Sequence, residues 1–303
     1  MSLPRPVVVV GDVLYDMLAY IGGGDGPAPG VDTFTPIHAS PGGSAANVAS
    51  HLARLGVETH FVGRAGDDPF GEFLSGGMER VGVKAHIARD RELSTGKVFV
   101  MVDGEGERTM ITDRGASEAL GPEDLPEGVF SPNSHLHLTG YTFSGGSRRD
   151  AAMKALRLAR EAGMSVSVDP SSALLLESIG PERFLKWMRG VDLCFPNLEE
   201  GALLSGSEDP ESVAEGLLGH CRAVALKLGA GGAMYADGSG RRTRQSAAEV
   251  PVVDTTGAGD AFCAGFLSGW IAGEDAGDSL RKGIALAGEV AGGFGGTTDT
   301  GLC

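Results

Sequence analysis

The sequence predicts an α/β fold, with a doubly wound, mostly parallel β-sheet flanked by helices and a small antiparallel β-sheet that projects from it as a lid. Short, continuous apolar runs such as Val7–Val10 are typical of buried parallel strands. These runs alternate with amphipathic helical patterns along most of the chain, which indicates βαβ units. Two β-rich pieces, residues 14–39 and 95–112, interrupt the alternation and predict the lid.

In the first half of the chain, apolar runs predict strands and glycines predict where helices end. Residues 7–12 read as a buried strand and a turn, and residues 14–21 and 34–39 as an outgoing and a returning strand. A helix is expected within 42–56, because Gly56 is a suitable C′ residue. The next expected elements are a strand at 59–66, a helix within 68–82, and a hairpin at 95–112 that turns at DGEG (103–106).

The second half continues the alternation of strand and helix. We expect strands at 135–140 and 164–170 on either side of a helix at 148–163, then a strand, turn and helix at 191–206. Residues 223–235 predict two strands joined by a glycine turn, and residues 258–270 and 279–294 the last two helices. A chain of 303 residues, 42% of them hydrophobic, fits one large α/β domain as well as two smaller ones, and we expect residues 1–303 to form one domain.

The net charge, the lengths of the apolar stretches and the cysteine spacing indicate which partners and which cellular environment to expect. The chain has 25 Lys and Arg against 40 Asp and Glu, a formal charge of −15, so we expect no nucleic-acid partner. No apolar stretch is long enough to cross a bilayer, so we expect no membrane partner. The four cysteines lack zinc-site or C-x-x-C spacing, which favours a reduced, cytoplasmic protein.

The stretch DTTGAGDAFCAGF, residues 254–266, carries the strongest chemical signal. Glycines at the start of a helix leave backbone N–H groups free to hold an anion such as a phosphoryl group. Asp260 follows in the first helical turn, where an acid commonly just complements the helix dipole. A carboxylate beside a bound phosphoryl group can instead accept the proton of an attacking hydroxyl, and the two functions together describe a kinase.

Three motifs resemble those of ribokinase-like (PfkB-type) carbohydrate kinases, in the family's order. They are PGGSAANVASHLARLG (41–56), FPNLEE (195–200) and DTTGAGDAFCAGF. The resemblance spans residue 7 to about residue 296 and implies a ribokinase-like fold. One departure is that Ser44 stands where typical ribokinases have lysine, which puts ribose itself in doubt as the substrate.

The resemblance implies roles on the nucleotide side, with ATP and Mg²⁺ as cofactors. Asp260 is the expected general base, with Gly257, Ala258 and Gly259 as the anion hole. The expected nucleotide and magnesium residues are Asn197, Glu200 (through water), Lys227 and Gly229. Asn197 and Glu200 also fit an ordinary helix capping box. Asp254 is a candidate ligand of a monovalent cation such as K⁺, or simply caps a turn.

On the substrate side, the residues expected to contact a small sugar or sugar derivative are Asp12, Asp16, Gly42, Gly43, Asn47 and Arg108. Arg108, or Arg114 close behind it, is suited to a carboxylate or phosphate on the substrate, or is only an exposed hairpin charge.

The sequence therefore predicts an ATP-dependent phosphotransferase that acts on a sugar hydroxyl. The alternatives are a nucleoside (adenosine-type) kinase and a catalytically weak sugar-binding regulatory protein on the same fold. A dinucleotide-binding oxidoreductase is disfavoured, because no G-x-G-x-x-G follows the first strand. The exposed edges of the lid would permit a homodimer.

Overall fold

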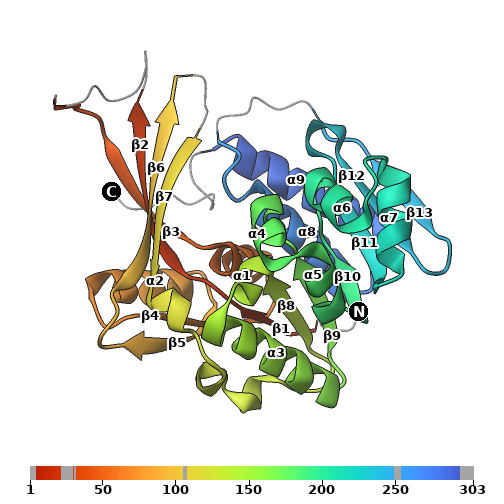
Figure 1. The fold of residues 1–303 in the computed structure, drawn as a ribbon, viewed down its shortest axis with the longest axis horizontal. Helices are drawn as coiled ribbons and strands as arrows, with labels where there is room; N and C mark the ends of the chain where they lie inside the picture. Colours follow the sequence, from red (N-terminus) through yellow and green to blue (C-terminus); the bar gives the residue numbers. More distant parts are fainter. Residues whose placement is uncertain (1–4, 22–29, 31, 105–107, 249–253, 294–303) are drawn as a thin grey trace.

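A nine-stranded sheet forms the centre of the computed structural model, which describes residues 5–21, 30, 32–104, 108–248 and 254–293 (Figure 1). The strand order is β13-β12-β11-β10-β9-β8-β1-β4-β5, parallel from β11 to β5 and antiparallel at β12 and β13. The strands are β1 (Val7–Val10), β4 (Thr59–Gly66), β5 (Lys84–Asp90), β8 (His135–Thr139), β9 (Ser165–Asp169), β10 (Val191–Cys194), β11 (Cys221–Lys227), β12 (Ala233–Asp237) and β13 (Arg242–Gln245).

Helices cover both faces of this sheet, as the sequence predicted. Val8 and Val10 of β1 belong to one apolar core with α3 (Gly146–Glu161), α4 (Ala173–Ile179), α5 (Pro181–Trp187), α6 (Leu198–Ser205) and α7 (Pro210–Leu218). Val7 and Val9 belong to the opposite core with α1 (Ser44–Arg54), α2 (Pro69–Arg80), α8 (Ala258–Ile271) and α9 (Ala276–Ala291). Consecutive side chains of a strand point to opposite faces, so a sheet covered on both sides needs unbroken apolar strands.

A second sheet projects from the main one, with the order β3-β2-β6-β7 (Figure 1). Its strands are β2 (Leu14–Ile21), β3 (Ile37–Gly42), β6 (Thr95–Asp103) and β7 (Arg108–Gly115). It is antiparallel at two of its three interfaces, whereas β2 and β6 pair in parallel. A small apolar cluster from β2 and β6 holds it together. The predicted hairpin is confirmed as β6 and β7, while the returning strand begins at Ile37 and ends at Gly42.

Some elements gave too weak a pattern to be predicted. Strands β5 and β13 lie at the two edges of the main sheet and have mixed or polar sequences, KAHIARD and RTRQ, in place of an apolar run. Helices α4, α5 and α7 have only seven to nine residues, too few for a clear helical period. Within the described ranges, five 3₁₀-helices lie in the connections: η1 (Ala116–Ala119), η2 (Pro122–Asp124), η3 (Glu127–Val129), η4 (Gly140–Phe143) and η5 (Gly229–Gly231).

The topology determines where a ligand can meet several loops at once. All the parallel strands have their carboxyl ends at the same edge of the main sheet, the usual place for ligands in such folds. The chain passes from β1 into β2, and from β3 into α1, close to this edge. Among the described helices, none combines the length and the apolar character that crossing a bilayer requires.

Candidate active site

Asp260 is held by two side chains that are more than 200 residues away in the sequence. Ser44 Oγ donates a hydrogen bond to Asp260 Oδ1 at 2.6 Å, and Asn47 Nδ2 donates one to Oδ2 at 2.9 Å. Ser44 and Asn47 are in the first turn of α1, and Asp260 is in the first turn of α8. The first and last motifs therefore meet, and the expected substrate residue Asn47 contacts the expected base.

The start of α1 depends on two glycines and an aspartate. Gly43 has φ +97°, and a Cβ at this residue would lie 2.7 Å from the main-chain oxygen of Asp12. A Cβ at Gly42 would overlap the Asp16 carboxylate. Because Gly43 has no side chain to cap the helix, Asp12 Oδ1 accepts the hydrogen bond of the Ala45 N–H at 3.2 Å. The glycines thus allow α1 to start directly against the turn that carries Asp12 and Asp16.

Two carboxylates in this region, Asp260 and Asp16, have a raised pKa. Burial raises the pKa of Asp260 to about 7, while the hydrogen bonds from Ser44 and Asn47 act in the opposite direction. Burial also raises the pKa of Asp16 to about 7, with the charges of Asp12 and Asp260 adding to the shift. Asp16 Oδ1 is buried without a hydrogen-bond partner among the described residues. Two acids that exchange protons near neutral pH are typical of a functional site.

The glycine loop in front of Asp260 presents main-chain N–H groups at the start of α8. Gly257 is the N-cap of this helix, with φ +73°, a conformation that favours glycine. The Ala258 N–H donates to Thr255 O at 3.2 Å, which differs from the free amide that the sequence suggested. The Gly257 and Gly259 N–H groups have no acceptor in the described part of the chain. These two amides are thus available to an anion.

A buried ion pair lies beside this loop. Lys227 Nζ, at the end of β11, is 2.8 Å from Asp169 Oδ2, at the end of β9. Burial alone would lower the pKa of Lys227, but the charge of Asp169 raises it well above its usual value. A Cβ at Gly259 would lie 3.6 Å from Lys227 Nζ, so the ammonium group borders the glycine loop. The position of Asp169 at the end of a predicted strand is a signal that could have marked it as a site residue from the sequence.

Asn197 and Glu200 form a complete capping box at the start of α6. Asn197 Oδ1 accepts from the Glu200 N–H at 2.8 Å, and Glu200 Oε2 accepts from the Asn197 N–H at 2.8 Å. Glu200 Oε1 also accepts from Asn197 Nδ2 at 3.0 Å. Burial raises the pKa of Glu200 to about 7, although the charge of Lys227 opposes this shift. The capping interpretation of this motif therefore has direct geometric support.

Comparisons with known proteins show the family to which the chain belongs. The family model described as "pfkB family carbohydrate kinase" matches residues 5–300. The chain belongs to the pfkB family of carbohydrate kinases. An ATP-dependent ribose-1-phosphate kinase from Halopiger xanaduensis is 35% identical over 254 residues, covering 84% of this chain and 81% of that protein. A fructokinase from Klebsiella pneumoniae is 36% identical over 236 residues, covering 76% of each chain.

Solved structures extend the agreement to the whole fold. The crystal structure of adenosine kinase from Sinorhizobium meliloti superimposes with a TM-score of 0.86 at 27% identity, and the match covers 97% of this chain and 96% of that one. This carbohydrate kinase therefore has the ribokinase-like α/β fold that the three motifs implied. It is an enzyme, and its reaction is phosphoryl transfer to a sugar hydroxyl.

Three further residues of this pfkB kinase were expected to bind a cation, the nucleotide or the substrate: Asp254, Gly229 and Arg108. Asp254 Oδ1 accepts hydrogen bonds from the N–H and the hydroxyl of Thr256, at 2.8 and 2.6 Å, which fits a turn-capping role. Gly229 has φ +56° in the turn after β11. Arg108 is the first residue of β7 and pairs with Val102, but its side chain lies outside the described structure.

Arg114, the alternative to Arg108, lies beside Asp12, one of the residues expected on the substrate side. Its Nη1 is 3.6 Å from Asp12 Oδ2, and its guanidinium carbon is 4.5 Å from the centre of the Tyr141 ring. Arg148, in the first turn of α3, lies close enough for the charges of Arg114 and Asp12 to influence its pKa. Tyr141 and Arg148 were not singled out from the sequence, because no pattern in their segments marks them as ligands.

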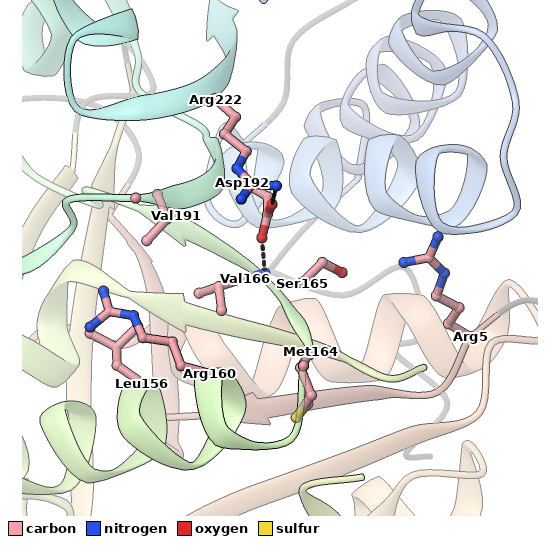
Figure 2. A pocket seen from close by; sticks show the side chains of 11 residues that line it. Arg5, Leu156, Arg160, Met164, Ser165, Val166, Val191, Asp192 and Arg222 are labelled. Carbon is pink, nitrogen blue, oxygen red and sulfur yellow. Dashed lines mark hydrogen bonds and ion pairs between the residues drawn. The ribbon is translucent and has the colours of Figure 1, made fainter. Parts of the chain in front are cut away.

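A cavity of about 440 Å³ lies away from this site, where strands β9, β10 and β11 begin (Figure 2). Arg5, Arg160, Asp192 and Arg222 are among its lining residues. It lies at the amino-terminal ends of strands whose carboxyl ends carry Asp169 and Lys227. The cavity is therefore at the opposite edge of the sheet from Asp169 and Lys227.

Proposed function

We propose that this kinase transfers the γ-phosphoryl group of ATP to a hydroxyl of a small sugar or sugar derivative, with Asp260 as the general base. The observation that carries the proposal is the position of the Asp260 carboxylate. It is held by Ser44 and Asn47, has a pKa near neutrality, and follows a loop with free N–H groups. A base with such a pKa is partly ionised at neutral pH and still accepts a proton well.

The proposed reaction moves one proton and one phosphoryl group. The substrate hydroxyl oxygen attacks the γ-phosphorus, the bond between that phosphorus and the β–γ bridging oxygen breaks, and ADP leaves. Asp260 takes the hydroxyl proton and later releases it to water. General-base assistance contributes about 10²–10⁴-fold, which is roughly 3–5 kcal/mol of barrier.

The glycine loop stabilises the transferring group in this proposal. The N–H groups of Gly257 and Gly259, at the positive end of α8, point to charge that develops on the phosphoryl oxygens. Ala258 contributes only if its hydrogen bond to Thr255 opens. Lys227 adds a fixed positive charge beside Gly259. ATP is the phosphoryl donor, and Gly229 lies in the turn next to the phosphates.

Magnesium would be held mainly by the ATP phosphates and by water. Among the described residues, no group of three or more His, Cys, Asp or Glu side chains is arranged to bind a metal. Both oxygens of Glu200 are engaged by Asn197, so this pair fits only an indirect role through water. That donor set suits Mg²⁺, which keeps several waters and takes few protein ligands. The ion would neutralise phosphate charge. A monovalent cation near Asp254 stays a prediction.

The sugar lies between Asp260 and the turn after β1 in this proposal. Asp16 and Asp12 accept hydrogen bonds from sugar hydroxyls, and the N–H groups of Gly42 and Gly43 face the substrate. The small sheet acts as a lid that excludes water from the transferring group. Residues 1–303 form a single catalytic domain. The exposed apolar side chains of Ile37, Met110 and Ile111 on the edge strands of the lid favour a homodimer through this sheet.

A nucleoside kinase is the second candidate, favoured by the similarity to adenosine kinase. Such a site needs an aromatic surface for the base. Tyr15 packs against Phe70 and Phe73, with ring centres 4.6 and 5.2 Å apart, and Tyr141 is covered by Arg114. The rings of Tyr15 and Tyr141 are occupied by other side chains and therefore favour a sugar without a base, whereas the ring of Phe34 is exposed.

A screen of acceptors tests the proposal. The protein is incubated with Mg·ATP and a panel of pentoses, hexoses, sugar acids, sugar phosphates and nucleosides, and ADP release is measured together with the mass of the product. Formation of a sugar phosphate ester that requires both the sugar and ATP is expected. The absence of any phosphorylated product across the panel would reject the assignment as an active kinase. Exclusive phosphorylation of nucleosides would favour the second candidate.

A further inference from the structure

Arg114 is a cation without a hydrogen-bonded partner at the sugar side of the site. Its five N–H donors make no hydrogen bond to any described residue, and its Nη1 is buried. The carboxylate of Asp12, at 3.6 Å, is beyond hydrogen-bond distance. The side chain is 22% exposed, so part of it can still be reached by a ligand. A guanidinium group cannot lose its charge, and its planar fork matches two oxygens of a carboxylate or phosphate.

A second guanidinium group reinforces this positive charge. Arg148 is only 5% exposed, and its Nη2 donates to Glu118 Oε1 at 2.9 Å and to Ser144 O at 3.0 Å. Its Nε and Nη1 are buried and have no acceptor in the described chain. Burial lowers the pKa of Arg148, and Arg114 contributes to this shift, while Glu118 and Asp12 oppose it. Two neighbouring guanidinium groups therefore retain three buried nitrogens without acceptors.

The geometry of the region favours an anion over a neutral group as the missing partner. Arg114 lies over the Tyr141 ring, with its guanidinium carbon 4.5 Å from the ring centre. Asp12 Oδ1 accepts from the Ala45 N–H, and Asp12 Oδ2 is 3.6 Å from Arg114 Nη1, so this carboxylate forms no hydrogen bond with either arginine. In a chain with a formal charge of −15, an anionic substrate is repelled at long range and needs such a local cluster of donors.

We propose that the substrate of this kinase is a sugar that carries an anionic group, a phosphate ester or a carboxylate, which Arg114 binds while Arg148 supports it from behind. This inference rests on the proposed function, because it concerns the same sugar site. Arg114 contacts the anion and displaces the long ion pair with Asp12. Arg148 is a positioning residue, since it is enclosed and acts through its charge. The names of the relatives leave this choice open, because they include both a ribose-1-phosphate kinase and fructokinases.

Matched substrates test the proposal. ADP release is measured with ribose, fructose and glucose, with monophosphates of these sugars that keep a free primary hydroxyl, and with gluconate and its keto acids. We expect kcat/KM to be at least about 10²-fold higher for one anionic class than for the neutral sugars. The class that reacts identifies the anion. A preference for neutral sugars overturns this inference but leaves the kinase assignment intact. No transfer to any sugar rejects the proposed function itself.

Variants of the two arginines provide a second test of the proposal. Arg114→Gln is expected to reduce kcat/KM for the anionic sugar by about 10²-fold and for neutral sugars much less, and Arg114→Lys to restore part of the loss. Arg148→Gln is expected to raise KM for the anionic sugar about tenfold with little change in kcat. Arg157→Gln, on the exposed side of α3, is the matched control and should leave both values unchanged. Equal losses for anionic and neutral sugars in Arg114→Gln would overturn the role of this residue.

Discussion

Ser44 Oγ donates a 2.6 Å hydrogen bond to the carboxylate of Asp260, and this bond joins the first and last motifs of the chain. Asn47 Nδ2 donates to the other carboxylate oxygen, so both oxygens of Asp260 accept hydrogen bonds from side chains of α1. A sugar hydroxyl would have to approach Asp260 beside these donors, which orient the carboxylate. Ser44 is therefore a positioning residue for the proposed base.

Replacement of the base tests its role directly. Asp260→Asn keeps the shape of the side chain, but it replaces one acceptor oxygen with an NH2 donor and removes the ability to accept a proton. We expect turnover to fall at least ~10²-fold. Binding of ATP, measured by calorimetry, should stay nearly unchanged, because the loop N–H groups remain. Turnover close to that of the wild type would exclude Asp260 as the base.

The activity should depend on pH through Asp260. The carboxylate accepts a proton only when ionised, and its pKa is raised to about 7. We therefore expect kcat/KM to increase from pH 5 to pH 8 with a midpoint near 7, measured with ADP detection that does not itself depend on pH. A profile that is flat across this range would contradict a raised pKa at the catalytic base.

Removal of the Ser44 hydroxyl should shift the pH profile of kcat/KM to higher pH. The hydrogen bond from Ser44 favours the ionised carboxylate, so Ser44→Ala should raise the pKa of Asp260 further. The low-pH limb of the kcat/KM profile is expected to shift to higher pH, with most activity recovered above pH 8. Ser50→Ala is a suitable control, because Ser50 is on the same helix but donates to Ala46 O. An unchanged midpoint in Ser44→Ala would mean that this bond has no influence on the base.

Asp16 should make the protein less stable at high pH. Its pKa is about 7 in the folded protein and near 3.8 when unfolded, so between these values the folded state binds more protons. The stabilisation from this group is complete below the unfolded pKa and is lost as the pH rises through 7. Asp16→Asn should therefore raise the Tm at pH 8 by about 2 °C or more and change it little at pH 4. An equal change at both pH values would refute the linkage.

The pair of Asp169 and Lys227 should show strong energetic coupling. Both side chains are largely buried, with 4% and 14% of their surfaces exposed. Lys227→Met leaves the Asp169 carboxylate without its partner, which should cost about 3–5 kcal/mol of unfolding free energy. The double variant with Asp169→Asn should recover much of this loss in denaturant unfolding, because no buried charge remains unpaired. Additive losses in the double variant would show that the pair is not coupled.

The amino-acid sequence by itself determined the alternation of strands and helices, the position of the glycine loop and the kinase chemistry. These follow from local patterns, since apolar periodicity and glycine spacing act within one segment. The sequence did not predict β5 and β13, because edge strands need less apolar surface. For Asn197 and Glu200 it left two roles open, a helix capping box and a contact near the nucleotide and magnesium, because both roles fit the same spacing.

Only the tertiary structure decided which distant residues meet. Ser44 and Asn47 contact Asp260, Asp169 pairs with Lys227, and Arg114 approaches Asp12, in each case across segments far apart in the chain. These contacts arise because parallel strands bring their carboxyl ends to one edge of the sheet, where turns and helix starts converge. Burial at that edge then sets the pKa values, and no local pattern encodes how much solvent a folded site excludes.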